Sequence, residues 1–174
     1  MPTRYPIPTT WLMTDERMGE GLWAAVERLP RGSGIVFRHH ATGLATRRAM
    51  FARLAWIARR RGLVLVRAGT ARLGRREDGI HGGHAGRGLR TAPAHDQREA
   101  LAAKRAGTDV IFVSPVFATR SHVGSPPLGP LKAAAIGRGL GMKRIALGGM
   151  DARRFRRLRG LGFYGWAAID AWLG

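Results

Sequence analysis

Short apolar runs alternate with longer segments of helical periodicity along most of the chain. The runs 63–66 and 110–113 are continuously apolar, which is typical of strands buried on both faces of a parallel sheet. Weaker runs of the same kind recur at roughly 20–25-residue spacing, as expected for βαβ units. Strands are therefore predicted at residues 10–14, 34–37, 63–66, 78–80, 89–92, 110–113, 144–147 and 166–169.

The clearest helix is predicted over Thr46–Arg61, where apolar residues recur every three or four positions and Gly62 provides a C-terminal stop. Another is predicted over Asp96–Ala106, which begins with a pair of acidic residues spaced as in a capping box. The glycine-rich segments on either side of the fourth strand are too short for such helices. Further helices are predicted at 19–29, at 131–138, and from Asp151 to Gly160.

Eight strands alternating with helices predict an α/β protein, and in particular a closed (β/α)8 TIM barrel. Typical barrels have about 200–250 residues or more, so a chain of 174 residues must shorten or omit some helices. We predict a pared-down barrel with short or missing helices after strands 3, 4 and 8, built as a single domain over residues 1–174. An open doubly wound sheet is the alternative.

The chain is strongly basic, with 30 Lys and Arg against 11 Asp and Glu and a formal net charge of +19. Such a charge can attract nucleic acid, which gives one class of function to weigh. All but three of the basic residues are arginines spread through every predicted helix, and this favours a compositional origin over a binding patch. The absence of cysteine excludes disulfides, thiolate metal sites and cysteine nucleophiles.

No apolar stretch approaches the roughly 20 residues that span a bilayer. The N-terminal residues also lack the basic-then-apolar layout of a secretory signal. From these features we expect a cytoplasmic protein without membrane contact.

Each of the six histidines follows a predicted strand, and the carboxyl ends of the strands in a barrel share one rim. A zinc site built on His81 and His84 is conceivable, but His84 lies in a glycine-rich loop and the spacing alone is weak support. The histidines are instead candidates for proton transfer, with ligand binding that varies with pH near neutrality. They are His39, His40, His81, His84, His95 and His122.

Several motifs fall in a fixed order along the predicted strand ends. They are Phe37-Arg38-x-His40, Asp78-Gly-Ile-His81, Ser114-Pro-Val-Phe-Ala-Thr119, Pro127-Leu-Gly129 and Ala146-Leu-Gly-Gly-Met150. In this order the chain resembles the thiamine-phosphate synthase and TenI-type thiazole-tautomerase superfamily from about Trp11 to Ile169. The resemblance implies a barrel that joins an aminopyrimidine (hydroxymethylpyrimidine) pyrophosphate to a thiazole phosphate with the help of Mg²⁺.

The resemblance also assigns site residues. It implies that Arg38 contacts pyrophosphate, that Thr119 supplies a hydroxyl, and that Gly148 and Gly149 form a backbone cradle for phosphate. The catalytic candidates are histidines: His40 and His122 stand where the superfamily has lysines, and His95 is what remains of a Ser-x-His motif.

Other positions depart from the superfamily pattern. Arg67-Ala68 replaces an Asn-Asp pair that binds metal, and the second metal carboxylate falls near Ala85-Gly86. We therefore expect a metal-poor site, with Mg²⁺ implied only by the resemblance and no metal ligand assigned. Asp170 replaces a phosphate-binding serine, where a carboxylate repels phosphate unless it is paired or protonated.

These observations leave three hypotheses open. The first is a transferase or tautomerase of thiamine biosynthesis in which Arg67 and the histidines take over the role of the metal. The second is a non-catalytic relative that binds a phosphorylated thiamine-related ligand. The third, and weakest, is a basic nucleic-acid-binding module. The expected partners are a small phosphorylated ligand and, because the last helix is missing, a second copy that covers the exposed flank as a homodimer.

Overall fold

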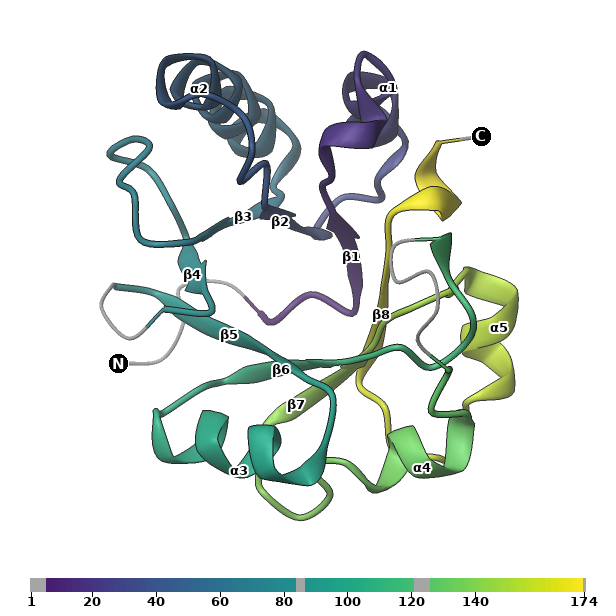
Figure 1. Cartoon of the computed structure of the whole chain (residues 1–174). Helices are drawn as coiled ribbons and strands as arrows, with labels where there is room; N and C mark the ends of the chain where they lie inside the picture. The colour runs from purple at the N-terminus through teal and green to yellow at the C-terminus, as the bar shows by residue number, and fades with distance from the viewer. Residues whose placement is uncertain (1–5, 84–86, 121–125, 174) are drawn as a thin grey trace.

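The chain folds into a closed barrel of eight parallel strands, paired in sequence order from β1 to β8 and back to β1 (Figure 1). The structure is a computed structural model that describes residues 6–83, 87–120 and 126–173. The predicted (β/α)8 fold is confirmed. The strands are β1 Thr10–Met13, β2 Gly34–Phe37, β3 Val64–Ala68, β4 Gly79–His81, β5 Leu89–Ala94, β6 Val110–Val113, β7 Lys143–Ala146 and β8 Gly165–Ala168.

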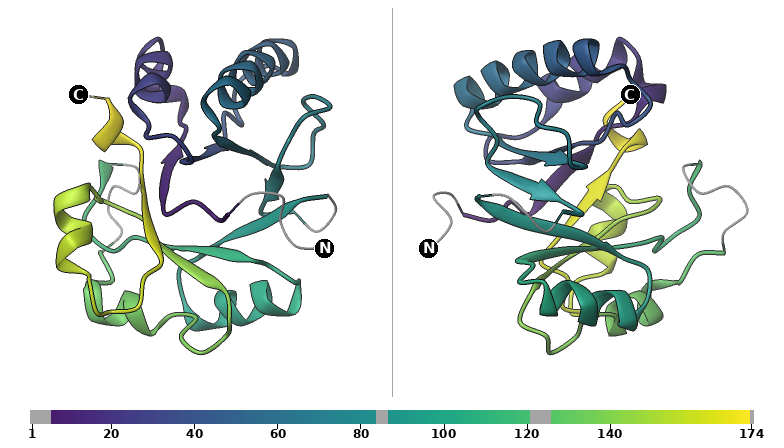
Figure 2. Two further views of the ribbon diagram at one scale, coloured as in Figure 1. Left: turned by 180° about the vertical axis from the view of Figure 1, so that it is seen from behind. Right: turned by 60° about the vertical axis from the view of Figure 1, so that its left-hand side comes forward.

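The helical layer is incomplete, as the length of the chain predicted. Figure 2 shows α1 and α2 on one side of the barrel and α3, α4 and α5 on the other. Among the described residues, no helix follows β3 or β4, and only a 3-10 turn follows β8. The helical elements are η1 Glu16–Met18, α1 Gly21–Arg28, α2 Leu44–Arg61, α3 Gln97–Arg105, α4 Pro130–Ala135, α5 Ala152–Arg157 and η3 Asp170–Trp172.

The helices begin and end where the sequence places caps. The Asp96 side chain accepts a hydrogen bond from the Glu99 N–H at 2.7 Å, and Asp151 does the same for the Arg154 N–H at 2.7 Å. Gly62 ends α2 in the left-handed conformation, with φ at 64°. None of the described helices is long and apolar enough to cross a bilayer.

Side chains alternate between the barrel interior and the helical layer. Trp11 faces inward: its ring occupies the space beside Gly34, where a Cβ would lie 2.1 Å from it, and it meets Phe112 edge-on at 5.3 Å. Phe37 faces outward and packs against Phe51 of α2 at 5.7 Å. This alternation decides which residues near the strand ends reach the site.

The C-terminal turn η3 packs beside α1, on the flank that a full eighth helix would cover (Figure 1). The Trp172 ring stacks on Trp166 at 5.2 Å, and its Nε1 donates a hydrogen bond to the carbonyl of Trp11 at 3.2 Å. Arg28 of α1 donates a hydrogen bond to the Trp172 carbonyl at 3.0 Å. One tryptophan therefore joins the last strand, the first strand and the first helix.

Candidate functional site

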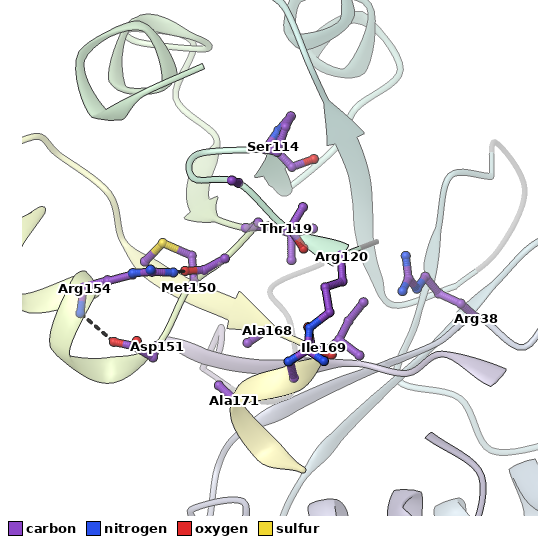
Figure 3. Close-up of a pocket in the computed structure, with 16 residues that line it drawn as sticks. Arg38, Ser114, Thr119, Arg120, Met150, Asp151, Arg154, Ala168, Ile169 and Ala171 are labelled. Carbon is purple, nitrogen blue, oxygen red and sulfur yellow. Dashed lines mark hydrogen bonds and ion pairs between the residues drawn. The ribbon is translucent and has the colours of Figure 1, made fainter. Parts of the chain in front are cut away.

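A cavity of about 360 Å³ opens at the carboxyl ends of β6, β7 and β8, with Arg38 of the β2 end on its far side (Figure 3). This volume lies within the range of small-molecule sites. The lining is partly apolar, with cationic groups of three arginines. The cavity is lined by Arg38, Ser114, Pro115, Ala118, Thr119, Arg120, Leu147, Gly148, Gly149, Met150, Asp151, Arg154, Ala168, Ile169, Asp170 and Ala171.

The turn after β7 requires glycine at two successive positions. Gly148 and Gly149 have backbone φ values of 95° and 59°, which residues other than glycine rarely adopt. A Cβ on Gly148 would lie 2.7 Å from Pro115 Cα, and one on Gly149 would lie 2.5 Å from the carbonyl oxygen of Ala118. The turn therefore lies directly against the loop after β6.

The backbone of this turn leaves donors without acceptors. Within the described residues, the N–H groups of Gly148, Gly149 and Met150 donate no hydrogen bond, although all three residues line the cavity. The carbonyl of Gly148, in contrast, accepts a hydrogen bond from the Phe117 N–H at 3.1 Å. Successive free N–H groups in such a turn form a concave anion-binding surface.

Two arginines that sequence patterns did not single out also line the cavity. Arg154 of α5 reaches the cavity wall (Figure 3). Its guanidinium donates a hydrogen bond to the Gly149 carbonyl and lies over the Phe117 ring at 5.2 Å, and these two contacts fix its position. Arg120 follows Thr119 and its side chain is 84% exposed. Neither stood out among so many arginines, although the spacing of Arg154 from the Asp151 cap placed it in the first turn of α5.

Arg38 is held in place by the loop after β1. Its Nε donates to the Thr14 carbonyl at 2.9 Å and its Nη2 lies 3.3 Å from Asp15 Oδ2. Its Nη1 has no acceptor among the described residues and remains available to a ligand. Arg47 supports the same segment by donating from one Nη2 to the carbonyls of Arg38, at 3.1 Å, and Ala68, at 2.7 Å.

Asp15 combines a capping role with the support of Arg38. Its carboxylate accepts a hydrogen bond from the Arg17 N–H at 3.0 Å, so Asp15 caps the 3-10 turn η1. Partial burial alone would raise the pKa of Asp15. Hydrogen bonds from Arg17 and the charges of Arg17 and Arg38 outweigh that effect and hold the pKa below its ordinary value.

The histidines near the site are biased toward the neutral form. His39 is buried, stacks on Phe37 and shares a hydrogen bond with Thr14 Oγ1 at 2.9 Å, so its role is structural. Burial lowers its pKa. His40 lies near Gly69 at the rim but does not line the cavity, and desolvation followed by the charge of Arg47 lowers its pKa.

His81 lies inside the barrel mouth. Its Nδ1 shares a hydrogen bond with Thr91 Oγ1 at 2.9 Å, and its ring meets Phe112 edge-on at 5.5 Å. Burial lowers the pKa of His81 to about 4, with smaller contributions from Arg38 and His40. For these histidines, the expected titration near neutrality therefore moves to lower pH.

Of the two other catalytic candidates, one does not line the cavity and one lies outside the described residues. His95 lies directly before Asp96, the cap of α3, with its backbone N–H and its Nδ1 each 2.8 Å from Glu99 Oε2, and it does not line the cavity. His122 lies outside the described residues, as does His84. The assignment of both candidates to catalysis stays a prediction.

Arg67 does not reach the cavity because it faces the outside of the barrel. It lies in register with Phe37, whose ring packs on α2, and its side chain is only 6% exposed. Its Nε and Nη2 pair with the two carboxylate oxygens of Glu77 at 2.5 and 3.1 Å. The bidentate geometry that we expected to clamp phosphate therefore binds a carboxylate of the same chain.

The described residues do not fit a Mg²⁺ site. At the end of β3, Ala68 faces the mouth of the barrel and offers no oxygen side chain, while the neighbouring Arg67 is cationic. Ala85 and Gly86 lie outside the described residues. Within the described ranges, no three His, Asp or Glu residues are grouped closely enough to hold a metal ion. Among the described residues, the cavity wall carries arginines, backbone N–H groups and the hydroxyls of Ser114 and Thr119, all of which can stabilise an anion.

Comparison with known proteins relates this site to one family. A family model described as thiamine monophosphate synthase matches residues 91–172, from β5 to η3, which includes most of the cavity. No curated protein matches the chain by sequence.

Solved structures share the barrel. Thiamine phosphate pyrophosphorylase from Pyrococcus furiosus has a TM-score of 0.74 at 18% identity, over 95% of this chain and 87% of that one. A FabK mutant from Thermotoga maritima gives 0.64 at 14% identity, over 98% of this chain and 63% of that one. The HpcH/HpaI aldolase from Desulfitobacterium hafniense gives 0.57 at 10% identity, over 94% and 86%. At these identities the structures establish the fold.

The family model covers slightly less than half of the chain, and it relates that part of the barrel, with most of the cavity, to thiamine monophosphate synthase. These findings support the predicted resemblance to the thiamine-phosphate synthase and TenI-type thiazole-tautomerase superfamily over residues 91–172, and the solved structure shares the barrel fold.

Proposed function

We propose that this protein binds a small phosphorylated ligand of the thiamine-biosynthetic kind, a thiazole phosphate or a hydroxymethylpyrimidine pyrophosphate, in the cavity above β6–β8. The phosphate lies against the N–H groups of the Gly148–Gly149 turn. The observation that carries the proposal is this turn, whose donors lack acceptors in the described part of the chain while the glycines pack against the loop after β6.

The charges around the cavity support an anionic ligand. Arg38, Arg120 and Arg154 line it together with two aspartates, and Asp151 is already engaged in capping α5. Arginine side chains and backbone N–H groups stabilise phosphate oxygens without a metal. Arg38 lies across the mouth from the turn, so a ligand with phosphate groups at both ends would be contacted from both sides.

The reaction that needs least from this site is proton transfer within a thiazole phosphate, as in a tautomerase. A proton leaves one ring position and another returns at a second, so no leaving group needs a metal. A neutral imidazole near the rim serves as the base, and His40 is the described candidate. Coupling with loss of pyrophosphate would require the three arginines to stabilise the departing charge.

A second candidate function is non-catalytic binding of the same ligand class. It is favoured by the engagement of Arg67 with Glu77 and of His95 with Glu99, which leaves fewer reactive groups at the mouth.

A thermal-shift titration with thiazole phosphate, thiamine phosphate and pyrophosphate, with and without Mg²⁺, tests the binding proposal. We expect stabilisation by the phosphorylated ligands that does not depend on Mg²⁺, following the usual linkage of binding to stability. A response that requires Mg²⁺ contradicts the metal-poor site, and no response to any of them contradicts the proposed ligand class.

Catalysis is then separated from binding by following the isotopic exchange of ring-attached protons in thiazole phosphate by NMR. Exchange that His40→Ala reduces at least tenfold, with ligand affinity unchanged, supports the tautomerase. Binding without exchange or coupling supports the non-catalytic candidate.

A further inference from the structure

Asp170 places a carboxylate on the wall of a cavity that is otherwise suited to anions. It follows β8, at the position where the resembling superfamily has a phosphate-binding hydroxyl, and its side chain is 38% exposed. The other acidic lining residue, Asp151, has a separate structural role because its Oδ1 accepts the Arg154 N–H that begins α5. The presence of Asp170 therefore needs its own explanation.

The described partners of Asp170 do not neutralise it. Arg120 Nε lies 3.8 Å from Asp170 Oδ2, which is too long for a hydrogen bond, and the Arg120 side chain is 84% exposed. Ion pairs of this kind contribute little because water screens them. Among the described residues, no group donates a hydrogen bond to the Asp170 carboxylate.

A phosphate held by the Gly148–Gly149 turn would thus share the cavity with an accepting, negatively charged group. A ligand that brings only phosphate is opposed by this charge. A ligand that carries an ammonium or another N–H donor beside its phosphate converts the same charge into a charge-assisted hydrogen bond.

We propose that Asp170 is a specificity-determining residue that selects phosphate monoesters with a positively charged or N–H-donating group next to the phosphate. This rests on the proposed function, because it takes the phosphate to lie at the turn. The alternative is that Asp170 only supports Arg120, which would then bind the phosphate itself.

The test compares phosphoethanolamine with propyl phosphate by isothermal titration calorimetry at constant ionic strength. The two probes have similar size and differ in an ammonium against a methyl group. We expect about tenfold tighter binding of phosphoethanolamine to the unmodified protein. In Asp170→Asn the preference should fall below about twofold, mainly because propyl phosphate binds more tightly. Asp170→Ser gives the same comparison should the asparagine variant fail to fold.

A matched control separates this local effect from the overall charge of +19. Glu27→Gln removes one negative charge from an exposed position paired with Arg61 on the α1 side, away from the residues that line the cavity. It should leave the preference at about tenfold.

The outcomes distinguish the two proposals, with pyrophosphate titrated in parallel. Equal affinity for the two probes in the unmodified protein, or a preference that survives in Asp170→Asn, overturns the role of Asp170. Equal weakening of both probes in Asp170→Asn also overturns it and makes Asp170 a support for Arg120. If pyrophosphate binds but the two probes bind equally, the phosphate site is supported and the role of Asp170 is overturned. If none of the three binds, the phosphate site itself is overturned.

Discussion

Gly149 is the residue whose replacement tests the phosphate cradle most directly. In Gly149→Ala the new Cβ meets the Ala118 carbonyl at 2.5 Å in a backbone with φ of 59°. We expect a loss of roughly 1–3 kcal/mol in the free energy of unfolding, because the methyl group and the left-handed backbone conflict. We also expect at least tenfold weaker pyrophosphate binding, measured by calorimetry on the folded variant.

Gly160→Ala is the matched control, since Gly160 has φ of 88° but a Cβ added there would meet no atom within 4 Å. It should lose about 1 kcal/mol through the backbone alone and keep its ligand affinity. Equal loss of pyrophosphate binding in both variants would show that the turn after β7 is not the phosphate site.

The pH dependence of stability is the second prediction at this scale. His81 has a pKa of about 4 in the folded protein, lowered by burial from 6.5. Below pH 6.5 the unfolded chain takes up a proton at this histidine while the folded protein does not. The free energy of unfolding therefore decreases as the pH falls from 6.5 toward 4, by up to about 3 kcal/mol in total. Asp15 and Glu16 also have lowered pKa values. They reduce the free energy of unfolding only at pH values near or below their ordinary pKa values of 3.8 and 4.5.

Denaturant unfolding between pH 7 and pH 5 isolates the histidines from these carboxylates. The free energy of unfolding should decrease across this range, and His81→Asn should flatten part of the decrease while preserving a polar partner for Thr91. The same slope in the variant and in the unmodified protein would remove His81 as a source of the effect.

The limits of sequence reasoning are clear at particular residues. The position of Gly148–Gly149 after a buried strand was predictable, because a Gly-Gly turn at a strand end is a local feature. Arg67 was not predictable, because its direction depends on the register that places it beside Phe37 and on the pairing with Glu77, which is ten residues away. Arg154 was hidden because arginines occur in every helix and only three-dimensional packing marks the one that reaches the cavity.

At the scale of elements, the boundaries of strands and helices followed from periodicity and caps, but the substitute for the eighth helix did not. Three residues of η3 take its place because Trp172 stacks on Trp166 and bonds to the Trp11 carbonyl. A single aromatic side chain can supply contact area comparable to a turn of helix. The hydrophobic periodicity of the sequence does not predict a contact made by one side chain.

Trp172→Ala should therefore lower the free energy of unfolding by about 2–4 kcal/mol, because it removes a packed ring and a hydrogen bond. Trp56→Ala is the control. Trp56 is 60% exposed and its ring lies under the Arg60 guanidinium, so its loss should cost less than about 1 kcal/mol. Equal losses in the two variants, measured by urea unfolding, would contradict the bridging role of the C-terminal turn.

For the whole molecule, the charge of +19 separates two kinds of anion binding. Arginines exposed on α2 and α5 attract any polyanion over a wide surface, whereas the cavity holds one small anion with backbone donors. Surface attraction releases counterions and therefore weakens steeply with salt, while binding by fixed donors is less sensitive. We expect duplex DNA of arbitrary sequence to bind at about 50 mM salt and to be lost by about 200–300 mM, as measured by fluorescence anisotropy.

Gly149→Ala should leave this DNA binding unchanged while it weakens pyrophosphate binding, because only the second depends on the turn. Excess pyrophosphate at fixed ionic strength should not displace DNA. Sequence-dependent binding that persists at high salt, or competition between the two ligands at the cavity, would instead favour a nucleic-acid function. Under the expected result, the overall charge sets how strongly anions gather at the surface, and the geometry of the strand ends sets which of them is bound.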